Sequence, residues 1–266
     1  MKNTKQLIVV ALVGVLLCLH SMAQAVPVDA NELIPERGVA SAGAAGRWDY
    51  GFLTGNGRIG AIVYGQPNHE TIVFNHERLY LPTPRPEMPD LGKTFDEVRR
   101  IAREEGHIAA RNFSLKQAID QGHFNYHSDP FHLAFELKLV MPAKGAVKDY
   151  LRTTDFQTGE VSTHWSDDDG KYVRKLFVSR PDNVAVLSIL PPDAKKLNLS
   201  ISTVPIVHDL IDSDLSVDDE WITSHNAYAL SPGGYDNVMR VITKGGHAKS
   251  DGNKIVITDA DEVLIL

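Results

Sequence analysis

The sequence predicts a mainly β fold, an antiparallel β-sandwich of the super-sandwich type with a short helical insertion. Short apolar runs recur about every 8–12 residues between turn residues, a spacing that is typical of sandwiches. The clearest run, His132 to Leu139, alternates so that Leu133, Leu137 and Leu139 share one face. Helical periodicity is confined to residues 94–122, so we expect strands to follow one another elsewhere.

Residues 1–25 have the pattern of a secretory signal. Lys2 and Lys5 precede an apolar stretch from Leu7 to Leu19, and Ala23-Gln24-Ala25 fits the small-x-small rule for cleavage. A membrane anchor is the alternative, but the stretch is shorter than the ~20 residues that cross a bilayer. We therefore expect export to the bacterial periplasm or secretion, with no membrane association after cleavage.

The charge balance excludes two classes of partner. The chain has 27 Lys and Arg against 34 Asp and Glu, a formal charge of −7, and loss of residues 1–25 removes two lysines and no acid. Nucleic acid and anionic membranes are therefore not expected as partners. Cys18 is the single cysteine and lies in the signal, so we expect neither a disulfide nor a reactive thiolate in the exported protein.

The mature chain is expected to begin with an irregular lead-in, residues 26–46, which is rich in Ala and Gly. The first strands are predicted at Ile59–Tyr64, Thr71–Phe74 and Arg78–Leu81, with turn sequences between them. The next segment, Leu81 to Pro89, carries four prolines. It is predicted to be a loop, because proline fits neither a helix interior nor a central strand.

Two short helices are predicted in the insertion. Thr94-Phe95-Asp96-Glu97 has the sequence of a capping box, in which the Thr side chain accepts from a backbone N–H and the Glu side chain reaches back. Gly106 is expected to close the first helix in a left-handed conformation. Apolar residues from Ile108 to Ile119 predict a second helix that ends near Gly122.

Downstream of the insertion the apolar period is two throughout. Ser166 to Gly170 has the composition of a hairpin turn. The chain stops within an apolar run, Val263–Leu266, and because domain termini are usually polar we expect the domain to be truncated. Further strands are predicted at Val147–Leu151, Val161–Trp165, Tyr172–Val178, Val184–Leu190, Leu197–Thr203, Ala227–Leu230, Val238–Thr243 and Ile255–Thr258.

Residues 55–65 read GNGRIGAIVYG, a glycine spacing that raises the question of a phosphate-binding loop. A Walker loop needs Lys-Ser/Thr after its last glycine, which is missing here. A dinucleotide fingerprint needs a strand before it and a helix after it, but the β-branched run follows the glycines. We therefore predict a turn at Gly55-Asn56-Gly57 and then a strand in which Gly60 lets a backbone or a bulky side chain approach.

The glycine run belongs to a set of motifs that resembles the N-terminal domain of glycoside hydrolase family 95, the α-L-fucosidase-like family. Trp48 precedes the run, Glu70-Thr71-Ile72 follows it, and Phe74 to Tyr80 resembles the family's N-E-x-x-L-W segment. The likeness spans residues 47–266, which it implies are one β-sandwich domain before a catalytic helical barrel. Further motifs continue it in order: Glu97-Val98-Arg99-Arg100, Tyr150-Leu151-Arg152, Tyr172-Val173-Arg174-Lys175 and Ala260-Asp261-Glu262.

The resemblance implies a parent enzyme that removes terminal α-L-fucosyl or α-L-galactosyl residues from glycans with inversion of configuration. Family members place the carboxyl groups of this inverting hydrolysis in an (α/α)6 barrel that follows the β-domain. No stretch of this chain resembles those motifs, so no catalytic residue is expected and the chain alone is expected to be inactive. Its glycan partner would be reached through the missing catalytic domain. Two positions depart from the family: Tyr80 replaces the usual tryptophan, and Pro130-Phe131-His132-Leu133 replaces Gly-Asp-Leu.

Six residues near the glycine run are candidates for a place beside the substrate or at the domain interface. Each also has a structural alternative: the aromatic residues as core plugs, the Asn and Glu of the N-H-E turn as turn formers, and the arginine as a clamp on the glutamate. The six candidates are Trp48, Asn56, Arg58, Asn75, Glu77 and Tyr80.

A free-standing carbohydrate-binding module is the alternative function. Such a module would present exposed aromatic residues, such as Trp165, Trp221 or Tyr228, to a glycan. Neither a cofactor nor a metal is expected in either case. His123 and His127 have the spacing of a helical metal pair, but the glycine and proline around them argue against a helix.

Overall fold

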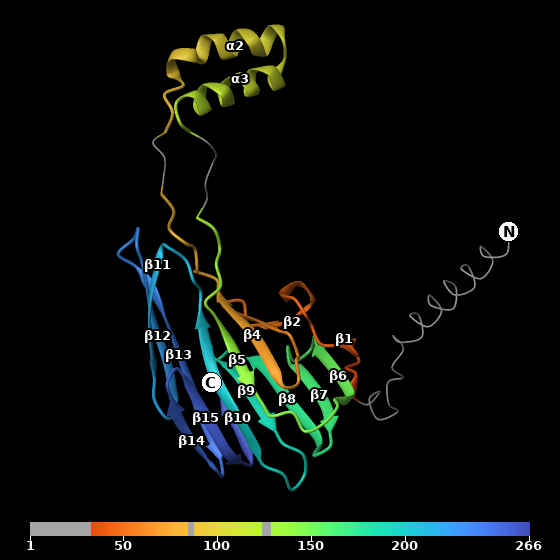
Figure 1. Ribbon diagram of the computed structural model, residues 1–266. Helices are drawn as coiled ribbons and strands as arrows, with labels where there is room; N and C mark the ends of the chain where they lie inside the picture. Colours follow the sequence, from red (N-terminus) through yellow and green to blue (C-terminus); the bar gives the residue numbers. More distant parts are fainter. Residues whose placement is uncertain (1–32, 85–87, 124–128) are drawn as a thin grey trace, which may run out of the picture.

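The computed structural model describes residues 33–84, 88–123 and 129–266. Within these ranges the chain forms two antiparallel sheets that face each other and an insertion of two helices (Figure 1). The fold class predicted from the sequence is therefore confirmed. The predicted signal, residues 1–25, lies outside the described residues. Over the described ranges, no helix combines the length and the apolar character needed to cross a bilayer.

The larger sheet has nine strands among the described residues, in the order β1-β6-β7-β8-β9-β16-β13-β12-β11. All neighbours pair antiparallel, and consecutive hairpins build most of it. Its strands are β1 (Gly38–Ser41), β6 (Lys148–Asp155), β7 (Val161–Asp167), β8 (Gly170–Val178), β9 (Ala185–Leu190), β11 (Ile211–Val217), β12 (Trp221–Tyr228), β13 (Gly234–Lys244) and β16 (Glu262–Ile265).

The smaller sheet has seven strands in the described part of the chain, in the order β14-β15-β10-β5-β4-β3-β2. It begins with the glycine-run hairpin, β2 to β3, at one edge. Its strands are β2 (Phe52–Gly55), β3 (Ile59–Val63), β4 (His69–His76), β5 (Phe135–Val140), β10 (Leu197–Pro205), β14 (His247–Asp251) and β15 (Lys254–Ala260).

The hydrophobic core lies between the two sheets. Alternation along each strand turns one set of side chains inward, so that Leu137 and Leu139 of β5 are each 1% exposed. Facing strands of the other sheet contribute Leu176, Leu187 and Ile189. Full burial of one such aliphatic side chain stabilises the fold by about 1.5–3 kcal/mol, so this interface holds the sheets together.

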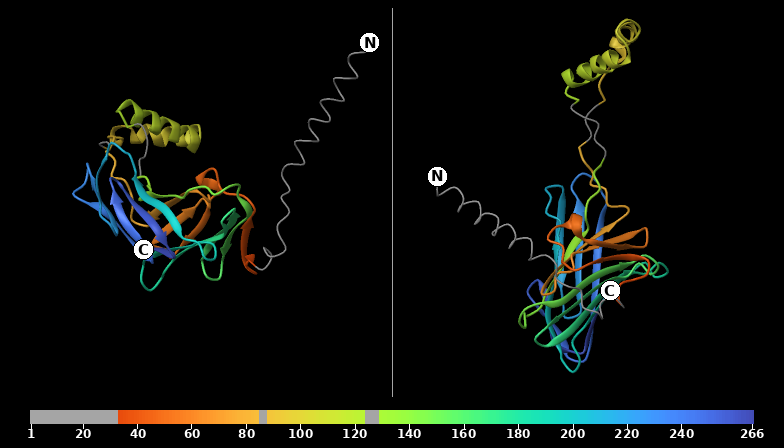
Figure 2. Two further views of the ribbon diagram at one scale, coloured as in Figure 1. Left: turned by 60° about the horizontal axis from the view of Figure 1, so that its bottom comes forward. Right: turned by 90° about the vertical axis from the view of Figure 1, so that its right-hand side faces the viewer.

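The helical insertion consists of η3 (Gly92–Thr94), α2 (Phe95–Glu104) and α3 (His107–Asp120), and the two α-helices form a hairpin away from the sandwich (Figures 1 and 2). Gly106 between them has φ +93° and ψ 169°, so the positive φ predicted for this glycine is confirmed, but the residue lies outside the left-handed helical region. The predicted capping box is wrong. The Thr94 hydroxyl donates to the Leu91 carbonyl at 2.9 Å, because a 3-10 turn leads into the helix, and Glu97 instead pairs with Arg100.

The two ends of the insertion meet at the sandwich. The Leu81 N–H donates to the Pro130 carbonyl at 2.9 Å, and the Thr83 N–H donates to Asp129 Oδ1 at 3.1 Å. Tyr80 and Phe131, the two departures from the family pattern, form a single bridge and an edge-to-face ring pair at 5.6 Å. The strand predicted at residues 78–81 is reduced to this bridge, because the prolines that follow cannot donate to a ladder.

The lead-in is not irregular throughout, which corrects the prediction for residues 26–46. Residues 38–41 form β1, which pairs with β6 from Arg152 to Asp155 at the edge of the larger sheet. Four small or weakly apolar residues give little sequence signal for a strand. Backbone hydrogen bonds to one neighbour stabilise β1 instead of side-chain burial.

Candidate functional site

The glycine run makes the β2–β3 hairpin and ties it to the opposite sheet. Gly57 has φ +94°, which glycine adopts without steric cost. Asn56 Oδ1 accepts from the N–H groups of Arg58 and Ile59, both at 2.9 Å. Asn56 Nδ2 donates to the Ser179 carbonyl at 3.0 Å and to Asn183 Oδ1 at 2.9 Å. One side chain therefore fixes both this turn and the β8–β9 loop.

Gly60 lies in β3 between Gly55 of β2 and Asn75 of β4. A Cβ atom at this position would lie 2.5 Å from Asn75 Oδ1, so the missing side chain leaves room for the Asn75 amide. A strand, not a helix, follows the glycines. The prediction of a turn and a close approach is confirmed, and the run has no helix N-terminus for a phosphate.

Asn75 and Asn183 both line a cavity of about 470 Å³ between the two sheets. The cavity walls come from β3, β4 and β5 of the smaller sheet and from β8, β9, β12, β13 and β16 of the larger one. Leu137, Leu176 and Leu187 are buried in its floor. Its more exposed lining contains Val238 and the polar residues Asn75, His76, Arg78, Asn183, Asp236 and Asn237.

Aromatic rings form two walls of the cavity. Phe74 and Phe135 stack at 5.0 Å between ring centres. Tyr228 and Tyr235 lie opposite them on β12 and β13, and the Tyr228 hydroxyl is 2.8 Å from His132 Nε2. Burial raises the pKa of Tyr235 to about 12 and lowers the pKa of His132. At neutral pH the Tyr235 hydroxyl and the His132 imidazole are therefore uncharged.

Of the six candidates near the glycine run, Asn75 alone lines this cavity. Asn56 does not line the cavity, but its hydrogen bonds to Ser179 and Asn183 fix the loop that does. Glu77 and Arg58 do not form the ion pair considered from the sequence: the Glu77 N–H donates to the Arg58 carbonyl at 2.8 Å, and the Glu77 carboxylate lies 3.9 Å from Arg78 instead. The reason is the β3–β4 pairing, which joins their backbones and leaves the side chains in solvent.

The two aromatic candidates are on the surface. Trp48, in the 3-10 helix η2 (Trp48–Tyr50), is 64% exposed, and Tyr80 is 52% exposed, so neither plugs the core. Among the aromatics considered for a binding module, Trp165 is 2% exposed and stacks on Tyr172, so its expected role as an exposed platform is wrong. Tyr228 does line the cavity.

Sequence reasoning missed most of the cavity lining. Arg78, Asn183 and Tyr235 were not singled out, because they come from three separate turns and strand ends that only the sandwich brings together. One local signal was present. Tyr228 and Tyr235 flank the Gly233-Gly234 turn between two strands, which places paired aromatic residues near one hairpin end.

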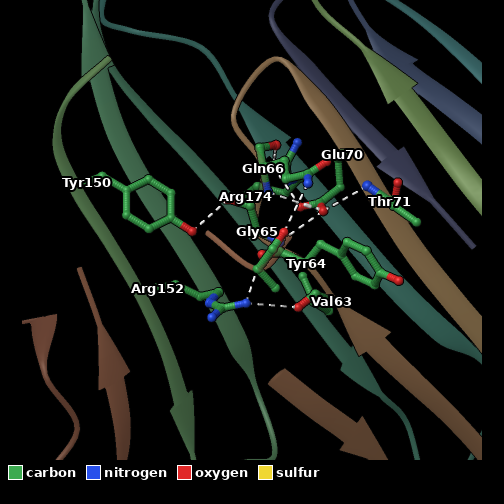
Figure 3. A network of polar contacts seen from close by, with 10 residues as sticks. Val63, Tyr64, Gly65, Gln66, Glu70, Thr71, Tyr150, Arg152 and Arg174 are labelled. Carbon is green, nitrogen blue, oxygen red and sulfur yellow. Dashed lines mark hydrogen bonds and ion pairs between the residues drawn. The ribbon is translucent and has the colours of Figure 1, made fainter. Parts of the chain in front are cut away.

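Beyond Gly65, at the other end of the glycine run, a buried polar network joins the sheets (Figure 3). Glu70 Oε1 accepts from the N–H groups of Gly65 and Thr71 at 2.9 Å and of Gln66 at 3.3 Å. Glu70 Oε2 lies 2.7 Å from Arg174 Nη2 of the larger sheet, and both side chains are almost fully buried. The network therefore links β4 to β8 through the core.

Arg152 is the second cation of this network (Figure 3). Its guanidinium donates to the carbonyls of Tyr64 at 2.8 Å and Tyr50 at 3.1 Å, and it stacks over the Phe52 ring at 4.1 Å. Burial raises the pKa of Glu70, while Arg174 and the three N–H donors act in the opposite direction. Three N–H groups donate to Glu70 Oε1 and the Arg174 guanidinium lies against Oε2, which favours a carboxylate and a structural ion pair over a proton donor.

The arrangement is suited to binding. The cavity combines an apolar floor and aromatic walls with amide groups at its mouth, and Asp236 is already paired with His225 at 2.6 Å. Over the described residues, no group of three His, Cys, Asp or Glu side chains could hold a metal ion.

Comparison with known proteins places the domain. A family model described as "Glycosyl hydrolase family 65, N-terminal domain" matches residues 39–266. The chain is 28% identical over 156 residues to the "Probable alpha-fucosidase A" of Aspergillus oryzae, covering 54% of this chain and 20% of that protein. It is 23% identical over 164 residues to "Alpha-L-fucosidase 2" of Arabidopsis thaliana, covering 60% of this chain and 19% of that protein.

The chain thus spans about a fifth of the length of the curated relatives that it matches. A solved structure of a proposed kojibiose phosphorylase from human microbiome aligns over 87% of this chain and 33% of that one, at 10% identity and a TM-score of 0.43. The matching family model carries the number 65, whereas the sequence motifs resemble family 95. Both agree on an N-terminal domain of a glycoside hydrolase, and the chain belongs to the family of glycosyl hydrolase family 65 N-terminal domains.

Proposed function

We propose that this chain is the non-catalytic N-terminal β-domain of an exported, inverting α-L-fucosidase-like enzyme of glycoside hydrolase family 95. The observation that carries the proposal is the alignment of two fucosidases with this chain over only about a fifth of their own length. In this proposal the remainder holds an (α/α)6 barrel that cleaves terminal α-L-fucosyl or α-L-galactosyl residues. Export follows from the signal pattern of residues 1–25.

The role proposed for the domain is to support that barrel. Trp48 is exposed in η2, just before β2, and Tyr80 is exposed at the base of the insertion. Large exposed aromatics are typical of surfaces that another domain covers. The buried carboxylate Glu70 is paired with an arginine, so it is not available as an acid or base. The domain therefore contributes shape and stability, while the barrel contributes the carboxyl groups.

The test compares two proteins. The chain alone is expected not to hydrolyse 4-nitrophenyl α-L-fucopyranoside or the α-L-galactopyranoside. A protein that continues through the coding sequence downstream of residue 266 is expected to hydrolyse at least one of them, and NMR of the first product should show the β-anomer. Hydrolysis by the chain alone, or a retained α-anomer, would contradict the proposal.

A second candidate function is a free-standing carbohydrate-binding module. The observation that favours it is the aromatic-walled cavity with Tyr228 in its lining. A stop codon after residue 266 in the gene, together with glycan binding by the chain, would support this candidate over the first.

A further inference from the structure

The mouth of the cavity holds polar groups that lack partners. The Asn75 amide has no hydrogen bond with any other residue that the structure describes, and neither does Asn183 Nδ2. The Arg78 guanidinium has only Glu77 at 3.9 Å, beyond hydrogen-bond distance. Arg78 and Asn183 are exposed and Asn75 is half-buried, so water can satisfy these groups until a ligand with matching donors and acceptors takes its place.

These groups are positioned by the fold. Gly60 leaves the space in which the Asn75 amide lies. Asn56 holds the carbonyl of Ser179 and Oδ1 of Asn183, so the β8–β9 loop is fixed at the opposite lip. Asn183 itself has φ +53°, a conformation that needs support from its surroundings. Two residues of the glycine run thus shape the two sides of one opening.

The chemistry of the lining selects a neutral polyhydroxylated ring. Asn amides offer both donors and acceptors, which match hydroxyl groups that also do both. The rings of Phe74 and Tyr235 offer flat apolar surface for the C–H face of a sugar. A purely apolar ligand would leave the amides unpaired. Arg78 at the mouth faces the Glu77 carboxylate at 3.9 Å and Asp236 is paired with His225, so neither sign of charge dominates the mouth, which favours a neutral ligand.

We propose that this cavity is a binding site for a neutral pyranoside, with Asn75 and Arg78 at one lip and Asn183 at the other. The volume of about 470 Å³ lies within the ~300–1,000 Å³ of small-molecule pockets and admits a mono- or disaccharide. The inference rests on the proposed function for the choice of glycan class. It adds that the β-domain itself contacts glycan, for example a branch of the substrate beyond the residue that is cleaved.

The test is a titration of the isotope-labelled chain with methyl α-L-fucopyranoside and methyl α-L-galactopyranoside, followed by NMR. The expected result is saturable shifts of the Tyr235 ring and the Asn75 and Asn183 side-chain amides, with a Kd at or below about 10 mM. Asn75→Ala is expected to weaken binding about tenfold, while Asn253→Ala, on an exposed turn between β14 and β15, leaves it unchanged.

Two results would overturn the proposal: no saturable shifts with either pyranoside, or shifts confined to residues outside the cavity such as Trp48. The wild-type ring and amide shifts carry the test even if Asn75→Ala does not fold. Failure of the cavity proposal is distinguishable from failure of the proposed function, because hydrolysis is measured on the longer protein and binding on this chain. If the longer protein hydrolyses the substrate but this chain binds neither pyranoside, only the cavity site is rejected.

Discussion

Breaking the buried ion pair between Glu70 and Arg174 is expected to be the most damaging single change in the core. Glu70→Leu would remove the acceptor of three backbone N–H groups and leave the Arg174 charge in the core, where both side chains are at most 2% exposed. Removing one partner of a buried pair costs about 3–5 kcal/mol. For a chain of this size that corresponds to a loss of roughly 6–20 °C in Tm.

The assay is reversible urea unfolding followed by tryptophan fluorescence, together with a thermal scan. Glu136→Gln is the matched control, because the Glu136–Lys138 pair is about one-third exposed and should contribute less than about 1 kcal/mol. The double variant Glu70→Leu, Arg174→Leu is expected to be less destabilised than the sum of the single variants, since no unpaired charge remains buried. A Glu70→Leu protein as stable as the Glu136→Gln protein would refute the reasoning.

Three further predictions follow from the turn and from two half-buried histidines. Gly60→Ala is expected to lower the free energy of unfolding by about 1–3 kcal/mol in urea titrations, because its Cβ would meet an amide oxygen at 2.5 Å, whereas Gly43→Ala, in open space, should change little. Asn56→Ala should cost about 1–3 kcal/mol by the same measurement, and Asn56→Asp less, because the carboxylate still accepts from the two turn N–H groups. Burial lowers the pKa of both His132 and His164, so the folded state favours neutral imidazole. The stability that these two histidines contribute is complete above pH ~6.5 and is lost as the pH falls through 6.5 toward their lowered pKa values. Tm should therefore fall between pH 7.5 and 5.5. An equal fall in Tm over this pH range after both histidines are replaced by Gln would contradict this assignment.

The strands with the plainest apolar alternation could be predicted from the sequence. The runs that became β5, β8, β10 and β15 were found because large aliphatic or aromatic side chains occupy most positions on one face of each strand. β11 was missed although it alternates as Ile-Asp-Ser-Asp-Leu-Ser-Val, because its outward face is acidic and reads as loop composition. β1 had no side-chain signal, since only its pairing with β6 makes it a strand.

The candidate site could be predicted only in part, for a different reason. Asn75 was found because it lies in a recognisable motif beside the glycine run. Asn183 is more than a hundred residues away, and only the facing of the two sheets brings it to the same cavity. A single sequence does not show that Asn75 and Asn183 are close in space. Likewise, the partner of Glu70 is on β8, so the buried ion pair could not be assigned from either segment alone.

The glycine spacing itself has a physical explanation in two sites along it, at Gly60 and at Gly65. Gly60 admits the Asn75 amide at the cavity, and at Gly65 an added Cβ would lie 2.5 Å from Arg152 Cδ and 2.7 Å from the Tyr150 hydroxyl. Gly65 also has φ +73°, and its N–H donates to Glu70. Gly60 lies within β3 and Gly65 follows two residues after the end of this strand, so the run holds the cavity and the buried ion pair in a fixed relation. Alanine at position 65 should therefore weaken the Glu70–Arg174 network without touching the cavity lining, and alanine at position 60 should do the reverse. Measuring Tm and pyranoside binding for both variants would separate the two roles, and equal effects of both on binding would reject this division.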